Sequence, residues 1–142
     1  MIILFDMYYE NSKVKMDMLL KNKEEIEDFV RLDIQVSFEF NFSTVESNIV
    51  WTQEDISILK EQIHEISSES IVGTLSSLEP DLTFMYIKDS EEETEELTLY
   101  ITLDSGLVNS AIGTETGPTL KIITTEDKLI KWINDIEHSF LG

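Results

Sequence analysis

A strict alternation of apolar and polar residues between Ile34 and Phe42 constrains the fold of this chain more than any other feature. The apolar positions are Ile34, Val36, Phe38, Phe40 and Phe42, and the positions between them hold Gln35, Ser37, Glu39 and Asn41. A period of two places one set of side chains on each face of a β-strand. The segment therefore predicts a strand with one buried face. Val14, Met16 and Met18 alternate in the same way and predict a second strand.

Two segments repeat their apolar residues at helical spacing instead. Thr52-Gln53-Glu54-Asp55 is typical of a helix N-cap with acids in the first turn, and the apolar residues that follow are Ile56, Leu59, Ile63 and Ile66. They predict a helix from about Gln53 to Ser67. Thr124-Thr125-Glu126-Asp127 predicts the cap of a final helix with the inner face Leu129, Trp132, Ile133, Ile136 and Phe140. We expect Trp51 and Trp132 to be core residues.

The remaining apolar runs are short and lie close together in the sequence. Leu82–Lys88 and Leu97–Leu103 predict two strands on either side of a polar hairpin loop, and Leu107–Ile112 and Thr119–Ile123 predict two more. Consecutive strands with short connections favour antiparallel pairing. We therefore expect an α+β fold, with an antiparallel β-sheet or sandwich and two amphipathic helices. Residues 1–142 fit a single domain, and no internal repeat is apparent in the sequence.

The charge of the chain narrows the choice of partner. Acidic residues number 29 and basic residues 10, which gives a net charge of −19. Between Arg31 and Lys121 the only cations are Lys60 and Lys88. Such a surface repels nucleic-acid phosphates and anionic lipids, and it attracts basic proteins from a distance. We expect a basic protein partner, with no direct nucleic-acid or membrane binding. Solubility alone is the simpler explanation of the charge.

Several classes of function find no support in the sequence. The chain has no cysteine, which excludes disulfides, thiol catalysis and cysteine-ligated metals. His64 and His138 are far apart, have no nucleophile motif beside them, and are expected at the surface. The acidic run from Asp89 lacks the spacing of a helix–loop–helix calcium site. We therefore expect no catalytic residue, metal or cofactor. The N-terminus lacks the pattern of a signal peptide, so a cytoplasmic location is expected.

Two acidic patches are candidates for partner binding. The first lies on the helix face opposite its apolar stripe and comprises Glu54, Ile58, Glu61 and Glu65, where one apolar residue is expected to be exposed among three acids. The second is the predicted hairpin loop, with Asp89, Glu91, Glu92, Glu93, Glu95 and Glu96. An exposed apolar residue within an acidic surround suits docking on a basic protein. A solvated helix face and a solvated hairpin tip are the simpler alternatives.

Three segments resemble the WapI-type immunity proteins. They are Trp51–Ile56, Leu78–Phe84 and the strand Leu97–Leu103, within a similarity that covers roughly residues 30 to 110. The resemblance implies a small cytoplasmic bacterial protein that neutralises a contact-delivered toxin. Its implied partner is the C-terminal toxin domain of a secreted, wall-associated YD-repeat protein, often a tRNA-cleaving nuclease. The family supplies no catalytic or contact residue to transfer to this chain.

Charge and resemblance together predict an immunity protein that occludes a basic nuclease domain. Opposite charge would speed the encounter, and apolar contacts would prolong the complex. An acidic adaptor or regulatory module with another basic partner is the alternative. An enzyme that uses a buried pair of carboxylates is a third possibility, and the 29 acids offer too many pairs for the sequence to single one out.

Overall fold

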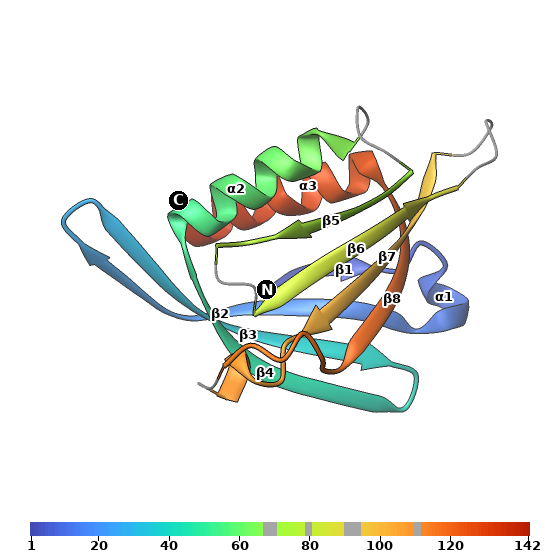
Figure 1. Ribbon diagram of the computed structural model, residues 1–142, viewed down its shortest axis with the longest axis horizontal. Coiled ribbons are helices and arrows are strands. Elements are labelled where there is room, and N and C mark those ends of the chain that lie inside the picture. The colour runs from blue at the N-terminus through green and yellow to red at the C-terminus, as the bar shows by residue number, and fades with distance from the viewer. Residues whose placement is uncertain (67–70, 79–80, 90–94, 110–111) are drawn as a thin grey trace.

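Two four-stranded antiparallel sheets form most of the computed structural model, which describes residues 1–66, 71–78, 81–89, 95–109 and 112–142 (Figure 1). Each sheet is a meander in which consecutive strands are neighbours. The first sheet contains β1 (Ile2–Phe5), β2 (Val14–Ile26), β3 (Phe29–Phe40) and β4 (Ser43–Thr52). The second contains β5 (Val72–Ser76), β6 (Leu82–Lys88), β7 (Glu96–Leu103) and β8 (Thr119–Thr125). The expected α+β class and antiparallel pairing are confirmed.

A helix follows each meander. These helices are α2 (Gln53–His64) after β4 and α3 (Glu126–Ile136) after β8, and α3 continues into the wider turn η3 (Glu137–Leu141). The order of four strands and a helix thus occurs twice, although the sequence shows no repeat. The helices lie side by side (Figure 1), with α2 against β3, β4 and β5 and α3 against β1 and β8. They therefore contact both sheets. The short α1 (Tyr9–Ser12) joins β1 to β2.

One hydrophobic cluster draws on both sheets and both long helices. The alternating residues of β3 contribute Leu32, Ile34, Val36 and Phe38 to it, as the period of two predicts. Phe40 and Phe42 were expected in the same buried row but are exposed, because the strand ends at Phe40 and the chain turns at Asn41. The cluster includes every residue expected on the inner face of the last helix, and it also includes Trp51 and Trp132. The expectation that both tryptophans are core residues is confirmed. His64 and His138 are both exposed, also as expected.

The predicted helix caps are present. The Thr52 hydroxyl accepts a hydrogen bond from the Asp55 N–H at 3.4 Å, and the Asp55 carboxylate accepts one from the Thr52 N–H at 2.7 Å. Asp55 also accepts the Leu78 N–H at 2.9 Å, so the cap of α2 holds the chain ahead of β6. The Thr125 hydroxyl accepts the Lys128 N–H at 3.2 Å and caps α3.

Several element boundaries differ from those expected. Strand β3 begins at Phe29 and ends at Phe40, because Asn41 has a positive φ of 59° that turns the chain into β4. Helix α2 ends at His64, and Ser67 lies outside the described residues. The strands β1, β4 and β5, together with the distal half of β2, were not expected from the sequence.

The strand expected at Leu107–Ile112 is wrong. Leu107–Asn109 form the short 3-10 helix η2, Ile112 is outside any strand, and residues 110 and 111 are not described. The Asp104 carboxylate explains the coil, since it accepts the N–H groups of Gly106, Leu107, Thr114 and Glu115 at 2.7 to 3.1 Å. These hydrogen bonds, led by that from Thr114, lower the pKa of Asp104 to about 2. Because these backbone N–H groups donate to Asp104, they cannot form the hydrogen bonds of a β-strand.

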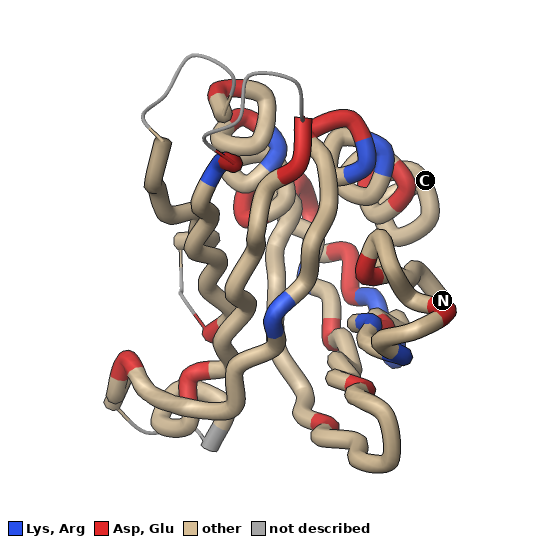
Figure 2. Tube along the Cα trace, turned by 90° about the vertical axis from the view of Figure 1, so that its right-hand side faces the viewer, with Lys and Arg blue, Asp and Glu red and all other residues tan. Residues whose placement is uncertain are grey.

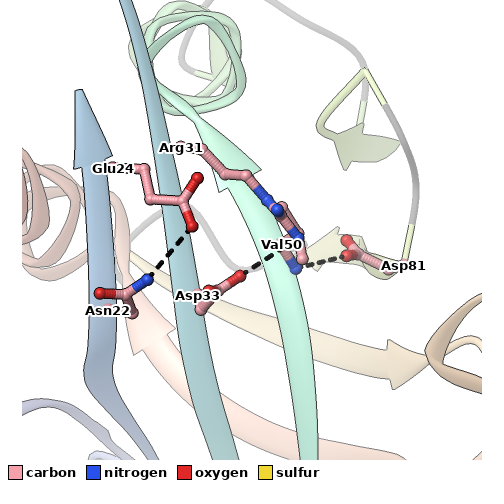
Figure 3. Close-up of polar contacts among 6 residues, drawn as sticks. All are labelled: Asn22, Glu24, Arg31, Asp33, Val50 and Asp81. Atoms are coloured by element: carbon pink, nitrogen blue, oxygen red, sulfur yellow. Dashed lines mark hydrogen bonds and ion pairs between the residues drawn. The ribbon is translucent and has the colours of Figure 1, made fainter. Parts of the chain in front are cut away.

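Two buried carboxylates join the sheets. After β1, the Asp6 carboxylate accepts the Ile123 N–H of β8 at 2.7 Å, and the Met7 N–H donates to the Ile123 carbonyl at 2.8 Å. Across the molecule, the Asp81 carboxylate ahead of β6 accepts the Val50 N–H of β4 at 3.4 Å. Figure 3 shows this second joint beside the Arg31–Asp33 ion pair of β3. The free edge of β5 is covered instead by Gln62 of α2, whose amide bonds both the N–H and the carbonyl of Ser76.

The raised pKa of Asp81 predicts that the free energy of unfolding depends on pH. Burial raises the pKa of Asp81 from 3.8 to about 6, although the N–H groups of Val50, Trp51 and Leu82 oppose the rise. The indole N–H of Trp51 makes no hydrogen bond of standard geometry among the described residues, yet it favours the charged carboxylate. A carboxyl with a raised folded pKa binds its proton more tightly in the folded state, so protonation stabilises the fold.

We therefore expect the free energy of unfolding of the wild type to rise relative to that of Asp81→Asn as the pH falls. The gain begins near pH 6, is complete below the unfolded pKa of 3.8, and reaches about 3 kcal/mol at 1.36 kcal/mol per pKa unit. Urea unfolding of both proteins between pH 7.5 and 4 measures it, and the variant, which cannot titrate at this position, supplies the baseline. If the two free energies of unfolding differ by the same amount across this pH range, the pKa of Asp81 is not raised in the folded protein.

Candidate functional site

The predicted acidic face of α2 is present, with one correction. Glu54, Glu61 and Glu65 are exposed, whereas Ile58 is half-buried and was expected to be exposed. Ile58 is therefore a poorer apolar anchor than the sequence suggested. Since a helix rises 1.5 Å per residue, Glu54 lies about 16 Å along the axis from Glu65. Only Glu61 and Glu65 belong to the C-terminal end of the helix.

The predicted acidic loop joins β6 to β7, and the structure describes its two ends. Asp89 and Glu95 are exposed, and the Asp89 N–H donates to the Glu96 carbonyl at 3.1 Å, which closes the base of the hairpin. Glu96 is the first residue of β7 and is half-buried. Glu91, Glu92 and Glu93, which were also predicted to bind the partner, lie outside the described residues.

The fold brings the end of α2, the base of this hairpin and the start of α3 together. Ile66, which follows Glu65, lines a cavity of about 280 Å³ with Leu97 and Lys88. The carboxylates around the same cavity are Asp89, Glu95, Glu96, Glu126 and Asp127. These five, with Glu61 and Glu65 on the last turns of α2, are called the acidic end. They come from elements far apart in the sequence, and carboxylates gathered in this way can receive the ammonium or guanidinium groups of a protein.

Local interactions fix parts of the acidic end. The Tyr8 hydroxyl donates a short hydrogen bond to Glu96, and this bond is the main reason that the pKa of Tyr8 is raised above its ordinary value. Burial and the charges of Glu96 and Asp6 raise it further. Glu126 and Asp127 occupy the first turn of α3, where the helix dipole stabilises negative charge. Glu61 and Glu65 lie at the C-terminal end of α2, where the dipole opposes it.

Five of the ten cations of the chain form ion pairs away from the acidic end. These pairs join Lys15 to Asp17 and Glu39, Lys23 to Glu25, Arg31 to Asp33, Lys60 to Glu137 and Lys131 to Asp135. None of these pairs includes a carboxylate of the acidic end. Figure 2 shows acidic positions of several elements gathered towards the upper end of that view, with some basic positions between them. Lys88 lines the same cavity and offsets one of the seven negative charges of the acidic end, which leaves a net negative potential for a basic partner.

A second acidic group lies at the tip of the β2–β3 hairpin, which projects at the left of Figure 1. Glu24, Glu25, Glu27 and Asp28 surround the exposed pair Ile26 and Phe29 there. Lys21, Lys23 and Arg31 offset most of this charge within the same hairpin. The tip is also held to the body, because Gln53 donates to the Asp28 carbonyl at 3.0 Å and Lys23 to the Leu141 carbonyl at 3.1 Å. The acidic end is therefore the stronger electrostatic site.

Within the part of the chain that the structure describes, no group of three or more His, Asp or Glu residues could hold a metal ion. The described helices include none that is long and apolar enough to span a bilayer. Comparison with known proteins finds no matching family model, curated protein or solved structure.

Sequence reasoning found part of the acidic end and missed the rest. It placed Glu61, Glu65, Asp89, Glu95 and Glu96 in two separate patches, and it treated Glu126 and Asp127 only as the acidic first turn of a helix. The missing information is tertiary, since β8 ends beside the start of β7 and delivers α3 to the hairpin base. Tyr8 carried no recognisable signal, because an isolated tyrosine near the N-terminus is not tied to Glu96 by any local spacing.

Proposed function

We propose that this chain is an immunity protein that binds a basic nuclease toxin domain in a one-to-one complex and blocks its substrate surface. The observation that carries the proposal is the acidic end, where carboxylates of the β6–β7 hairpin and α3 line one cavity beside Glu61 and Glu65 at the end of α2. The resemblance to WapI-type immunity proteins suggests the kind of partner, a tRNA-cleaving domain, and the cytoplasm of the producing cell as the place of action.

The physical basis is charge complementarity. A nuclease must bind a polyanion, so the surface around its active site is commonly basic. An acidic inhibitor competes for the same surface, and opposite charges raise the rate of productive encounter by about 10- to 1,000-fold. Because the Debye length is about 10 Å at 0.1 M salt, the clustered carboxylates act on the partner before contact. Binding that is fast and stoichiometric is what protection from an incoming nuclease requires.

Co-expression with the toxin domain encoded beside this chain's gene tests the proposal. We expect cells that produce both proteins to survive with intact tRNA, whereas cells that produce the toxin domain alone lose viability and tRNA. A toxin domain of an unrelated class, expressed at a similar level, is the specificity control. Loss of viability and cleaved tRNA in the presence of the folded wild-type chain would overturn the immunity assignment.

A further inference from the structure

The outer face of the second sheet is almost free of charge. Alternation along β5 to β8 turns one side chain in two away from the core, and the strand register aligns the outward residues in three rows, beyond which Glu96 pairs with Thr125 at the hairpin end. The rows are Val72-Ile87-Thr98-Ile123, Thr74-Met85-Tyr100-Lys121 and Ser76-Thr83-Thr102-Thr119. Lys121 is the only charged residue in them. In a chain with a net charge of −19, so large a neutral area is unexpected.

This face exposes apolar side chains that lie close together. Val72 is 52% exposed, Met85 40% and Ile87 37%. Met85 and Ile87 alternate on β6; Tyr100 of β7 pairs with Met85, and Ile123 of β8 ends the row of Ile87. A hollow of about 500 Å³ opens over the same strands, and Met85, Tyr100 and threonines of all four strands line it. A hollow lined by the exposed Met85 and the half-buried Tyr100 is the kind of surface that receives an anchor residue of another protein.

The outer face of the first sheet provides a comparison within the same molecule. It carries Lys15 paired with Glu39 at 3.0 Å and Arg31 paired with Asp33 at 3.5 Å, as well as the exposed Glu46. Mixed charges of this kind are typical of a sheet face that remains in water. The neutrality of the second sheet is thus specific to that sheet and is not a general property of the fold.

Carboxylates frame the neutral face at both ends of the strands. Ile87 and Thr98 of the first row are followed towards the hairpin by Asp89, Glu95 and Glu96 of the acidic end. At the opposite end of the strands, Glu115 of the loop after β7 is exposed and lines the hollow. An apolar centre with a charged rim is the arrangement found in protein interfaces, where the rim excludes water from the contacts that hold the complex.

We propose that the outer face of β5–β8 is the dehydrated centre of the interface with the basic partner, and that the acidic end is its rim. The inference rests on the proposed function and replaces Ile58 as the predicted apolar contact. The partner surface that fits is an apolar patch bordered by Lys and Arg side chains. A second copy of this chain fits poorly, because two faces with acidic rims would repel each other.

A matched pair of substitutions tests the inference. Ile87 and Val50 are each 37% exposed on strands, one on the neutral face and the other on the first sheet. Ile87→Lys and Val50→Lys both change the net charge from −19 to −18, so they alter long-range attraction equally. We expect Ile87→Lys to raise the dissociation rate from the inactivated toxin domain about 30-fold or more, because it places a charge in a dehydrated contact opposite a basic partner. Val50→Lys should change it by less than about 2-fold.

Met85→Lys provides a second position if Ile87→Lys does not fold, and thermal unfolding of each variant is measured first. Dissociation rates come from biosensor measurements with the toxin domain encoded beside this chain's gene.

If the wild type binds and folded Ile87→Lys or Met85→Lys dissociates no faster than Val50→Lys, the face is not the interface, and the proposed function stands. If the wild type does not bind at all, the proposed function fails and this inference fails with it. Dimerisation of the wild type through this face, abolished by Met85→Lys, would contradict the inference in favour of a second copy.

Discussion

Neutralising the acidic end is expected to slow association with the toxin domain about 10- to 100-fold at low ionic strength. The variant combines Glu61→Gln, Glu95→Gln, Glu126→Gln and Asp127→Asn, and it leaves Glu96 in place because that residue bonds Tyr8. Three of the four charges line one cavity and Glu61 lies at the end of α2 beside it, so their removal lowers the local potential more than the net charge alone would indicate. Stopped-flow association at 50 mM and 500 mM salt measures the effect, which should largely disappear at the higher concentration.

The control removes the same amount of charge elsewhere. Glu10→Gln, Glu24→Gln, Glu27→Gln and Asp28→Asn lie on α1 and the β2–β3 hairpin, and both quadruple variants take the net charge from −19 to −15. We expect the control to slow association by less than about 3-fold, since these charges lie away from the docking surface. Equal slowing by the two variants would show that net charge alone steers the encounter and would remove the special role of the acidic end.

Asp6→Ala is expected to reduce the free energy of unfolding by about 2 to 4 kcal/mol, because it leaves buried donors without acceptors. The Asp6 carboxylate accepts the Ile123 N–H at 2.7 Å, the Ser12 hydroxyl at 2.7 Å and the Tyr8 N–H at 3.3 Å. It thereby holds β8 to the end of β1 and positions Tyr8 towards Glu96. The loss should therefore loosen the junction between the sheets as well as destabilise the whole protein.

Asp6→Asn separates the individual hydrogen bonds. Its amide oxygen can still accept the Ile123 N–H, whereas its NH₂ group cannot accept the Tyr8 N–H, so we expect a smaller loss of about 1 to 2 kcal/mol. Glu10→Ala, which removes an exposed carboxylate of α1, should change stability by less than about 0.5 kcal/mol. Urea unfolding of the three variants measures the order of their free energies of unfolding. A stability of Asp6→Ala equal to that of Glu10→Ala would show that Asp6 does not join the sheets.

The elements that sequence reasoning located are those whose local signals agree. Strand β6 has the predicted bounds, and both long helices begin at the predicted threonine caps, because alternation or capping marks them directly. Strand β1 has four residues, too few for a period to stand out. Strand β4 places Ser47 among its inward positions, which interrupts its apolar row. The segment after Asp104 has the composition of a strand, but a buried carboxylate engages its backbone.

Sequence reasoning predicted parts of the candidate site but could not predict that they lie together. Charge density along the sequence identified Glu61, Glu65 and the β6–β7 loop, yet their proximity depends on how the two meanders and their helices pack. The neutral face was missed because its threonines look like the ordinary wet side of a strand. Its significance emerges when four strands are aligned and their three outward rows are found to hold one charged residue, Lys121.

The most direct measurement is a titration of the purified toxin domain with this chain, scored by the rate of tRNA cleavage. With the toxin domain well above the dissociation constant, the account predicts a linear fall in cleavage that reaches zero at a one-to-one ratio. The acidic-end quadruple variant should reach the same end point only after longer preincubation, because it associates slowly. Undiminished cleavage in the presence of a several-fold excess of the folded wild-type chain would contradict the account.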